Sequence, residues 1–181
     1  MDALIRLAGP NDPAAIAAIY RPYVGSSHFT FEEVAPDADA IAARIGNPTH
    51  PWLVVEIGGR VVGYASTSRL RDRAAYRWSI ETGIYIAAAA QGRGLGRRLL
   101  AAHLDTLERQ GFVTAIAGIA LPNDSSVALH QKLGFSLSGV ERGVGFKFGK
   151  WIDVARWQRD LAIRTNVPSD PLNSAILVPL A

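Results

Sequence analysis

The chain has 181 residues, of which 49% are hydrophobic and 19% are charged, and it contains no cysteine. These values predict one globular domain with a sizeable core, and they exclude disulfides, thiolate metal sites and a cysteine nucleophile. The formal net charge is only +3 with the basic residues scattered, and the four histidines lack metal-ligand spacing, so we expect neither a nucleic-acid partner nor a metal.

The first half of the chain predicts strands and helices in mixed order. We expect a strand, two helices, a hairpin of two strands and a long strand at residues 5–7, 13–20, 37–45, 52–57, 61–68 and 76–86. Pro13 is favoured at the first position of a helix, and Gly58 and Gly59 supply a two-residue hairpin turn. Residues 21–36 are expected to be irregular, and residues 69–73 form a basic loop before the long strand.

The second half predicts a helix, a strand, a second helix and two late strands. We expect them at residues 96–110, 115–121 and 125–133, with the last two strands in 135–162 around a loop at 145–150. A strand–helix–strand unit in the middle of the chain requires a parallel pair with a right-handed crossover. The predicted fold class is therefore mixed α/β, a mostly antiparallel sheet with a central parallel strand pair flanked by helices.

No internal repeat or domain boundary is evident, so residues 1–162 are expected to form one domain. Residues 163–181 carry three prolines and are expected to form a tail that runs over the surface or onto a partner. The first residues do not resemble a signal peptide, and no apolar stretch approaches the length of a membrane span. We therefore expect a cytoplasmic protein without a membrane partner.

A glycine-rich turn, Gln91-Gly92-Arg93-Gly94-Leu95-Gly96-Arg97-Arg98, separates the long strand from the central helix. Three glycines in five residues let the backbone approach a ligand closely, because no Cβ intervenes. The first amides of a helix lack intrahelical partners and lie at the positive end of its dipole, so they suit an anion. The turn, with its three arginines, therefore predicts a pyrophosphate site.

Two nucleotide motifs fit this turn poorly. A P-loop needs a Lys-Ser/Thr pair that is absent here, and a dinucleotide fingerprint needs glycine at position 97 and an acid about twenty residues further on. A mobile glycine turn is a further alternative. The pattern Gln-x-x-Gly-x-Gly between a strand and a helix instead resembles the acetyl-CoA loop of the GNAT superfamily of N-acetyltransferases.

Glu81 is the first catalytic candidate. Alternation along the long strand places Ile80 and Thr82 on the core face and Glu81 on the polar face, about ten residues before the turn. At roughly 3.3 Å per residue, this carboxylate is within reach of the reactive end of a long cofactor. Acetyl transfer to an ammonium needs a proton acceptor. The alternative is a glutamate that is solvated or paired with a neighbouring arginine.

His130 is the second candidate, on the inward face of the helix at 125–133. A core histidine bonded to a carbonyl is the common alternative. In the GNAT pattern, Asn-x-x-Ala/Ser is followed four residues later by a tyrosine that protonates the leaving thiolate. Asn123, Ser126 and His130 stand at those places, so the resemblance leaves His130 as general acid, as base or as a structural residue.

Several blocks of sequence resemble the phosphinothricin N-acetyltransferases and their methionine sulfoximine/sulfone relatives. They lie at residues 51–54, 75–85, 121–130 and 157–160. This resemblance implies a small L-amino acid analogue as substrate, and a pocket that contains Arg73 and Tyr76, with Phe31 as a wall and Arg71 as a weaker candidate. Arg69 is expected to be solvated. Glu32 stands where the compared enzymes have a basic residue.

The resemblance also implies how acetyl-CoA would bind. The pantetheine would run along Ile84, Tyr85, Ile86 and Ala87, with Asn123 and Ser126 opposite, and the pyrophosphate would lie on the amides of residues 92–98. Glu81 would take the proton, the amine would attack the thioester directly, and a backbone N–H near Tyr85 would stabilise the oxyanion.

The resemblance further implies a homodimer. Two alternatives stay open from the sequence: an N-acetyltransferase for another amine, such as a protein N-terminus or a polyamine, and a non-catalytic acyl-CoA-binding module.

Overall fold

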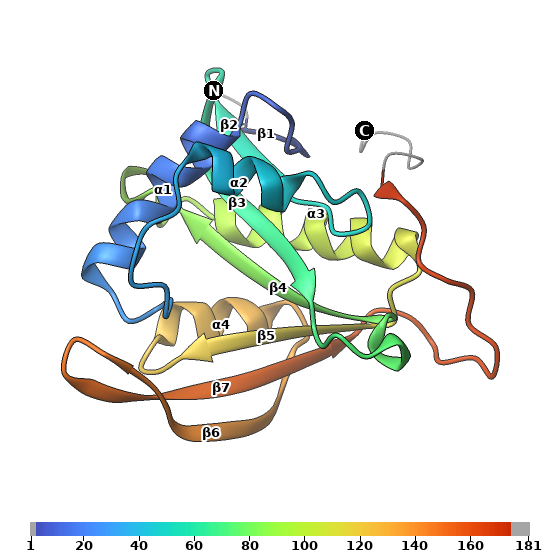
Figure 1. Ribbon diagram of the computed structural model, residues 1–181. Coiled ribbons are helices and arrows are strands. Elements are labelled where there is room, and N and C mark those ends of the chain that lie inside the picture. Colours follow the sequence, from blue (N-terminus) through green and yellow to red (C-terminus); the bar gives the residue numbers. More distant parts are fainter. Residues whose placement is uncertain (1–2, 175–181) are drawn as a thin grey trace.

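A seven-stranded sheet in the order β1-β2-β3-β4-β5-β7-β6 organises the molecule (Figure 1). The computed structural model describes residues 3–174. The strands are β1 Ala3–Leu7, β2 Leu53–Ile57, β3 Arg60–Arg69, β4 Ser79–Ile86, β5 Thr114–Ala120, β6 Ser136–Lys147 and β7 Lys150–Asp160. Only β4 and β5 pair in parallel in the part of the chain described, which confirms the predicted mixed α/β fold.

Four α-helices cover the two faces of the sheet. They are α1 Pro13–Ser26, α2 Ala38–Ile45, α3 Leu95–Gln110 and α4 Asp124–Lys132, with short 3-10 helices at Ala74–Tyr76 (η1) and Ala88–Ala90 (η2). Helices α1 and α2 pack on one face, and α3 and α4 pack on the other (Figure 1). In α3 the buried leucines recur at helical spacing, and burying each such side chain contributes about 1.5–3 kcal/mol.

Three elements differ from their predicted bounds. Helix α1 continues to Ser26 through an internal Pro22, whereas an irregular segment was expected after residue 20. Strand β4 begins at Ser79 and not at Tyr76, because the preceding residues form the 3-10 turn η1. The loop predicted at 145–150 is instead a tight turn in which Phe148 and Gly149 both adopt positive φ. Strand β6 therefore continues to Lys147, and β7 begins at Lys150.

The parallel pair β4–β5 opens shortly after it begins. The two strands are in register from Ser79 opposite Thr114 to Glu81 opposite Ile116, while β4 stays paired with β3 as far as Ile86. Beyond Glu81 the β5-facing edge of β4 is therefore unpaired. This separation creates the cleft described below.

The part of the tail that the structure describes lies against the domain. The Trp78 indole N–H donates to the Ser169 carbonyl at 2.8 Å, and Arg77 pairs with Asp170 at 2.6 Å. Leu172 N donates to the Gln110 carbonyl at 2.7 Å. No helix within residues 3–174 has the length and apolar character needed to cross a bilayer.

A fully buried histidine makes the stability of this core depend on pH. His103 in α3 is 0% exposed, and its Nε2 lies 2.8 Å from Thr67 Oγ1. Thr67 Oγ1 donates to the Pro51 carbonyl, so it accepts from His103 Nε2–H. Burial lowers the pKa of His103 to about 4, and the folded state therefore holds it neutral.

We expect acid to destabilise the protein through His103. The unfolded chain binds a proton below pH 6.5 while the folded chain does not, so this contribution is complete above pH 6.5 and is lost as the pH falls toward 4. Between pH 7 and pH 5 the loss is about 2 kcal/mol. Urea unfolding of the wild type and of His103→Gln at both pH values measures this loss. The free energy of unfolding of the variant should fall less between pH 7 and pH 5 than that of the wild type, and an equal fall in the two proteins would contradict the assignment.

Candidate active site

The separation of β4 and β5 leaves a cleft of about 360 Å³ that we call the cofactor cleft. Residues 82–86 of β4 and 117–120 of β5 form its walls, and α4 and the glycine-rich turn close its ends. Predicted residues that line it are Ile84, Tyr85, Ile86, Gln91, Gly92, Gly94, Leu95, Gly96, Asn123, Ser126 and His130. The fold thus brings the turn, β4 and α4 around one space.

The glycine-rich turn has the open backbone that its sequence predicts. Gly92 and Gly94 adopt φ of 72° and 73°, and a Cβ added at either would meet no atom within 4 Å. Arg98 N donates to the Gly94 carbonyl at 3.3 Å, so the amides just before it are those that a first helical turn leaves without intrahelical partners. These donors at the positive end of α3 fit a pyrophosphate.

Several predicted cofactor contacts lie elsewhere. The Arg98 amide is bonded within the helix, and its side chain donates to the Ala3 carbonyl at 3.2 Å. Arg97 is exposed outside the cleft lining. The Ala87 amide donates to the Val62 carbonyl at 2.8 Å, which removes it from a pantetheine ladder. Arg93 faces a different cavity.

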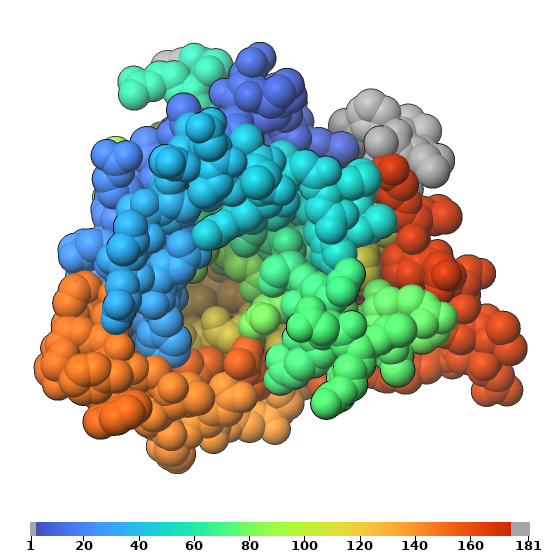
Figure 2. Space-filling view, viewed as in Figure 1, coloured from blue at the N-terminus to red at the C-terminus, as the bar shows by residue number. Residues whose placement is uncertain are grey.

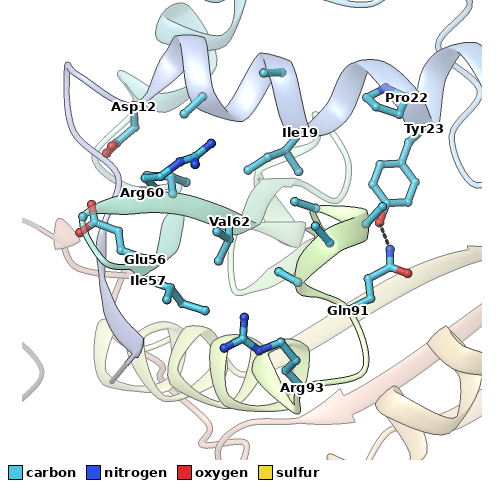
Figure 3. A pocket seen from close by; sticks show the side chains of 18 of the residues that line it. Asp12, Ile19, Pro22, Tyr23, Glu56, Ile57, Arg60, Val62, Gln91 and Arg93 are labelled. Carbon is cyan, nitrogen blue, oxygen red and sulfur yellow. Dashed lines mark hydrogen bonds between the residues drawn. The ribbon is translucent and has the colours of Figure 1, made fainter. Parts of the chain in front are cut away.

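That cavity, which we call the hairpin cavity, has a volume of about 1020 Å³ and lies between α1 and the β2–β3 hairpin. Figure 3 shows Arg93 and Arg60 on opposite sides of it. The cavity adjoins the cofactor cleft at Gln91, whose Nε2 donates to the Tyr23 hydroxyl at 2.8 Å. Although it is the largest of the three cavities we describe, neither Glu81 nor His130 lines it, so we assign no chemistry to it.

Backbone alternation decides which β4 amides face the cofactor cleft. Ala87 N donates to β3, and alternate residues of a strand direct their N–H groups to the same edge. The Tyr85 N–H therefore points to β3 and not to the cleft. Ile84 and Ile86 direct their backbone groups to the cleft, and the Ile86 carbonyl already accepts from the Tyr23 hydroxyl at 2.7 Å. The oxyanion donor predicted near Tyr85 is consequently expected to be the N–H of the adjacent Ile84.

His130 lies at the α4 side of the cleft. It is 3% exposed, and its Nδ1 is 2.8 Å from the Ser126 carbonyl, which only accepts hydrogen bonds, so Nδ1 carries the proton. Burial lowers the pKa of His130, opposed by this backbone bond. Its imidazole is therefore neutral near pH 7, with Nε2 as a proton acceptor. Asn123 caps α4 by accepting from Ser126 N at 3.2 Å.

A second cavity of about 700 Å³, which we call the amine pocket, opens on the α1–α2 face. Figure 2 shows a hollow there, framed by the blue and cyan α1–α2 segment, the green loop after β3 and the orange β6–β7 hairpin. The charged or titratable residues that line the pocket are Tyr20, Glu32, Arg44, His50, Tyr64, Arg69, Asp72, Glu81 and Tyr85. It therefore presents both cations and carboxylates.

The predicted substrate residues, other than the base, do not line this pocket. Arg71 donates to its neighbouring Leu70 carbonyl at 2.8 Å, Arg73 precedes η1, and Tyr76 is 42% exposed. The Phe31 ring lies against Gly145, where an added Cβ would fall 2.2 Å from its Cζ. Arg69, which was expected to be solvated, is indeed 60% exposed, and it also lines the rim of this pocket.

Arg44 is a further pocket residue that the sequence reading missed. It pairs with Glu32 at 2.8 Å, and both line the amine pocket. Nothing in the local sequence distinguishes Arg44 from any other cation in the last turn of a helix.

Gly118, in the apolar run 115–121, is a pocket residue that the sequence could have indicated. A glycine inside a strand often marks a place where another group approaches the backbone closely.

The cofactor cleft and the amine pocket meet at one point in the sheet. Both are lined by Thr82, Gly83 and Tyr85 of β4 and by Gly118 of β5. Glu81 lies beside this junction, and its Oε1 accepts from Arg156 Nη1 at 2.8 Å. The pairing with an arginine that was raised as an alternative for Glu81 is therefore present. Within residues 3–174, no group of three or more histidine or carboxylate side chains is placed to hold a metal.

Comparison with known proteins gives consistent matches over most of the chain. A model of the acetyltransferase (GNAT) family matches residues 15–135. The chain is 37% identical over 166 residues to the phosphinothricin N-acetyltransferase of Streptomyces viridochromogenes, and the match covers 88% of each chain. It is 36% identical over 163 residues to the L-methionine sulfoximine/L-methionine sulfone acetyltransferase of Salmonella typhimurium, covering 87% of this chain and 94% of that one.

A solved structure of a related enzyme has the same fold as this chain. The GNAT superfamily phosphinothricin acetyltransferase of Sinorhizobium meliloti, crystallised in complex with AcCoA, has a TM-score of 0.88 and 38% identity, covering 93% of this chain and 94% of that one. The resemblance drawn from the glycine-rich turn and the sequence blocks is thus confirmed. From these matches in sequence and fold, the chain belongs to the acetyltransferase (GNAT) family.

Proposed function

We propose that this enzyme transfers the acetyl group of acetyl-CoA to the α-amine of a small L-amino acid analogue, of the phosphinothricin, methionine sulfoximine or methionine sulfone type. The observation that supports it best is the junction at Gly83 and Gly118, where the two cavities meet beside Glu81. The named activities of relatives at 36–37% identity support the same reaction and substrate class.

The amine pocket suits a zwitterion. An amino acid presents a carboxylate and an ammonium, and this pocket contains Arg44 and Arg69 as well as Glu32, Asp72 and Glu81. A polyamine would require carboxylates without the arginines, because like charges repel at contact distance. A purely acyl-CoA-binding module would not need a second charged cavity at the end of the cofactor cleft.

Each catalytic residue is assigned one task. Acetyl-CoA supplies the activated acetyl group as a thioester. Glu81 accepts one proton of the ammonium, the amine attacks the thioester carbonyl, which the Ile84 N–H polarises, and the C–S bond then breaks. CoA leaves as a thiolate that takes up the second proton lost by the nitrogen. Asn123 and Ser126 line the cleft opposite β4. The amides of the first turn of α3 bind the pyrophosphate. Neutral His130 orients groups in the cleft through Nε2 and does not act as the general acid, because its one proton is bonded to the Ser126 carbonyl.

A substrate panel at constant acetyl-CoA tests this function. Methionine sulfoximine, methionine sulfone and phosphinothricin are compared with spermidine and with a peptide that has a free N-terminus. We expect kcat/KM for at least one of the three amino acids to exceed that for the other two amines by 100-fold or more, a difference of about 2.7 kcal/mol. Binding of acetyl-CoA without turnover of any amine would favour the binding module instead.

We further propose that the enzyme is a homodimer formed through the β6–β7 hairpin. Strand β6 is an edge strand, and the turn end of the hairpin exposes four large apolar side chains, 54–70% accessible: Val144, Phe146, Phe148 and Trp151. Exposed apolar clusters of this kind mark interaction surfaces.

The proposed location of the enzyme is the cytoplasm, where acetyl-CoA is available, and cell fractionation tests this location.

Trp151→Glu tests the dimer. By burying a charge in an apolar interface, it should raise the dissociation constant at least tenfold, which is about 1.4 kcal/mol, and light scattering during gel filtration should report a monomer. Val167→Glu is the matched control, since Val167 is 88% exposed in the tail. A wild-type protein that is monomeric at tens of micromolar would contradict the proposal.

A further inference from the structure

We propose that Arg156 is a positioning residue for the transfer reaction. It holds the Glu81 carboxylate at the junction of the cofactor cleft and the amine pocket, and Glu141 fixes the orientation of its guanidinium by accepting a second hydrogen bond. This inference rests on the proposed function, because it takes Glu81 as the proton acceptor.

The geometry joins three strands through one guanidinium. Arg156 in β7 donates from Nη1 to Glu81 Oε1 in β4 at 2.8 Å and from Nε to Glu141 Oε2 in β6 at 3.1 Å. A planar guanidinium presents donors in a fixed fork, so these two bonds set its orientation. The Glu81 side chain thereby loses its freedom to rotate away from the junction.

Gly118 makes this bridge possible. Strand β5 lies between β4 and β7, so the Arg156 side chain has to cross β5 to reach Glu81. It crosses at Gly118, its own partner in the β5–β7 ladder. A Cβ on Gly118 would lie 2.9 Å from Arg156 Nη1 and 3.3 Å from Glu81 Oε1. Gly118 therefore lets the Arg156 side chain approach Glu81 across the strand, and it also lines both cavities where they meet.

The contacts of the bridge leave part of the Glu81 carboxylate available for a substrate. The three side chains are 29–40% exposed, so their interaction is only partly screened by water. Arg156 contacts Oε1 of Glu81, which leaves Oε2 for the amine. Glu141 accepts from the same guanidinium, so the cation is shared between two carboxylates and is held from both sides.

The other charged groups around the pocket are largely offset by one another. Those that line the pocket with Glu81 are Glu32, Arg44, His50, Arg69 and Asp72. Arg44 pairs with Glu32 at 2.8 Å, and Arg69 lies 4.0 Å from Asp72. Among the residues described, Arg156 is therefore the cation in direct contact with Glu81, and its removal should dominate the change in the field at that carboxylate.

Two substitutions should lower kcat while leaving the KM for acetyl-CoA unchanged. For the best amino acid of the panel, Arg156→Gln should lower kcat by about tenfold or more, because the Glu81 carboxylate is then free to rotate away from the junction. Glu141→Gln should lower it less, because the guanidinium keeps its bond to Glu81 and loses only the second bond that fixes its orientation. Arg142→Gln is the matched control: its side chain is 82% exposed and pairs with Asp153, and we expect unchanged kinetics.

A conservative variant separates charge from position. Arg156→Lys keeps the positive charge and should restore part of the kcat that Arg156→Gln loses, but kcat should stay several-fold below that of the wild type, because one ammonium does not span both carboxylates. An unchanged kcat in Arg156→Gln, or a rise in the KM for acetyl-CoA as large as the fall in kcat, would overturn the inference. If Glu81→Gln itself kept full activity, the proposed function would fail, which is a distinguishable result.

Discussion

Glu81→Gln is expected to lower kcat by about 10²–10⁴-fold at pH 7.5, the range that loss of a general base produces. Glutamine preserves the size of the side chain and a carbonyl oxygen that can still accept from Arg156 Nη1. It removes the only property that the proposed mechanism requires, the capacity to take a proton from the ammonium. The affinity for acetyl-CoA should change little, because Glu81 lines the amine pocket and not the cofactor cleft.

Steady-state kinetics with both substrates varied measures this effect. Glu108→Gln, an exposed glutamate of α3, is the matched control and should have wild-type kinetics. Raising the pH should recover part of the activity of Glu81→Gln, because more of the amine is then unprotonated without help. A variant that keeps more than half of the wild-type kcat would remove Glu81 from the mechanism.

Gly96→Asp is expected to weaken acetyl-CoA binding by more than about 100-fold while leaving the fold intact. Gly96 lies in the first turn of α3 and lines the cofactor cleft. A Cβ there would meet Leu129, Ile86 and Ile84 no closer than 3.7 Å, so the Cβ of a substituted residue fits, and the carboxylate beyond it can extend into the open cleft. Two unit charges about 5 Å apart repel by about 3 kcal/mol at an effective dielectric constant near 20, which opposes a pyrophosphate at this helix end.

Thermal unfolding and calorimetric titration separate the two halves of this expectation. An acidic residue in the first helical turn stabilises a helix by about 0.3–1 kcal/mol, so the melting temperature of Gly96→Asp should not fall. Gly96→Ala adds the Cβ without the charge and should cost roughly tenfold or less in affinity. If the wild type, Gly96→Asp and Gly96→Ala bound acetyl-CoA with equal affinity, the pyrophosphate could not lie at this turn.

Much of the fold is visible in local sequence patterns. The order of strands and helices, the two-residue turn before β3 and the cap of α4 by Asn123 all follow from signals a few residues long. The glycine-rich turn belongs to this group, because positive φ at Gly92 and Gly94 is a property of the residue type. The errors in the fold lie at element ends, where residues 21–26 were expected to be irregular and Tyr76 was placed in a strand.

The substrate side of the site was predicted less well, for a physical reason. The loop at residues 69–76 offers Arg69, Arg71 and Arg73, and the structure places the first of these in the amine pocket. Which arginine of a loop faces a cavity depends on how that loop folds against α2 and the sheet. No periodicity constrains it, so composition alone could not choose among them.

By itself, the sequence determined the order of the elements, the glycine-rich turn before α3 and the face of β4 on which Glu81 lies, since each follows from backbone preferences or a two-residue period. Only the tertiary structure decided that Arg156, 75 residues away along the chain, reaches Glu81 across Gly118. It also decided that β4 and β5 separate beyond Glu81. Contacts between strands that are distant in sequence leave no local pattern, because they arise from the packing of the whole sheet.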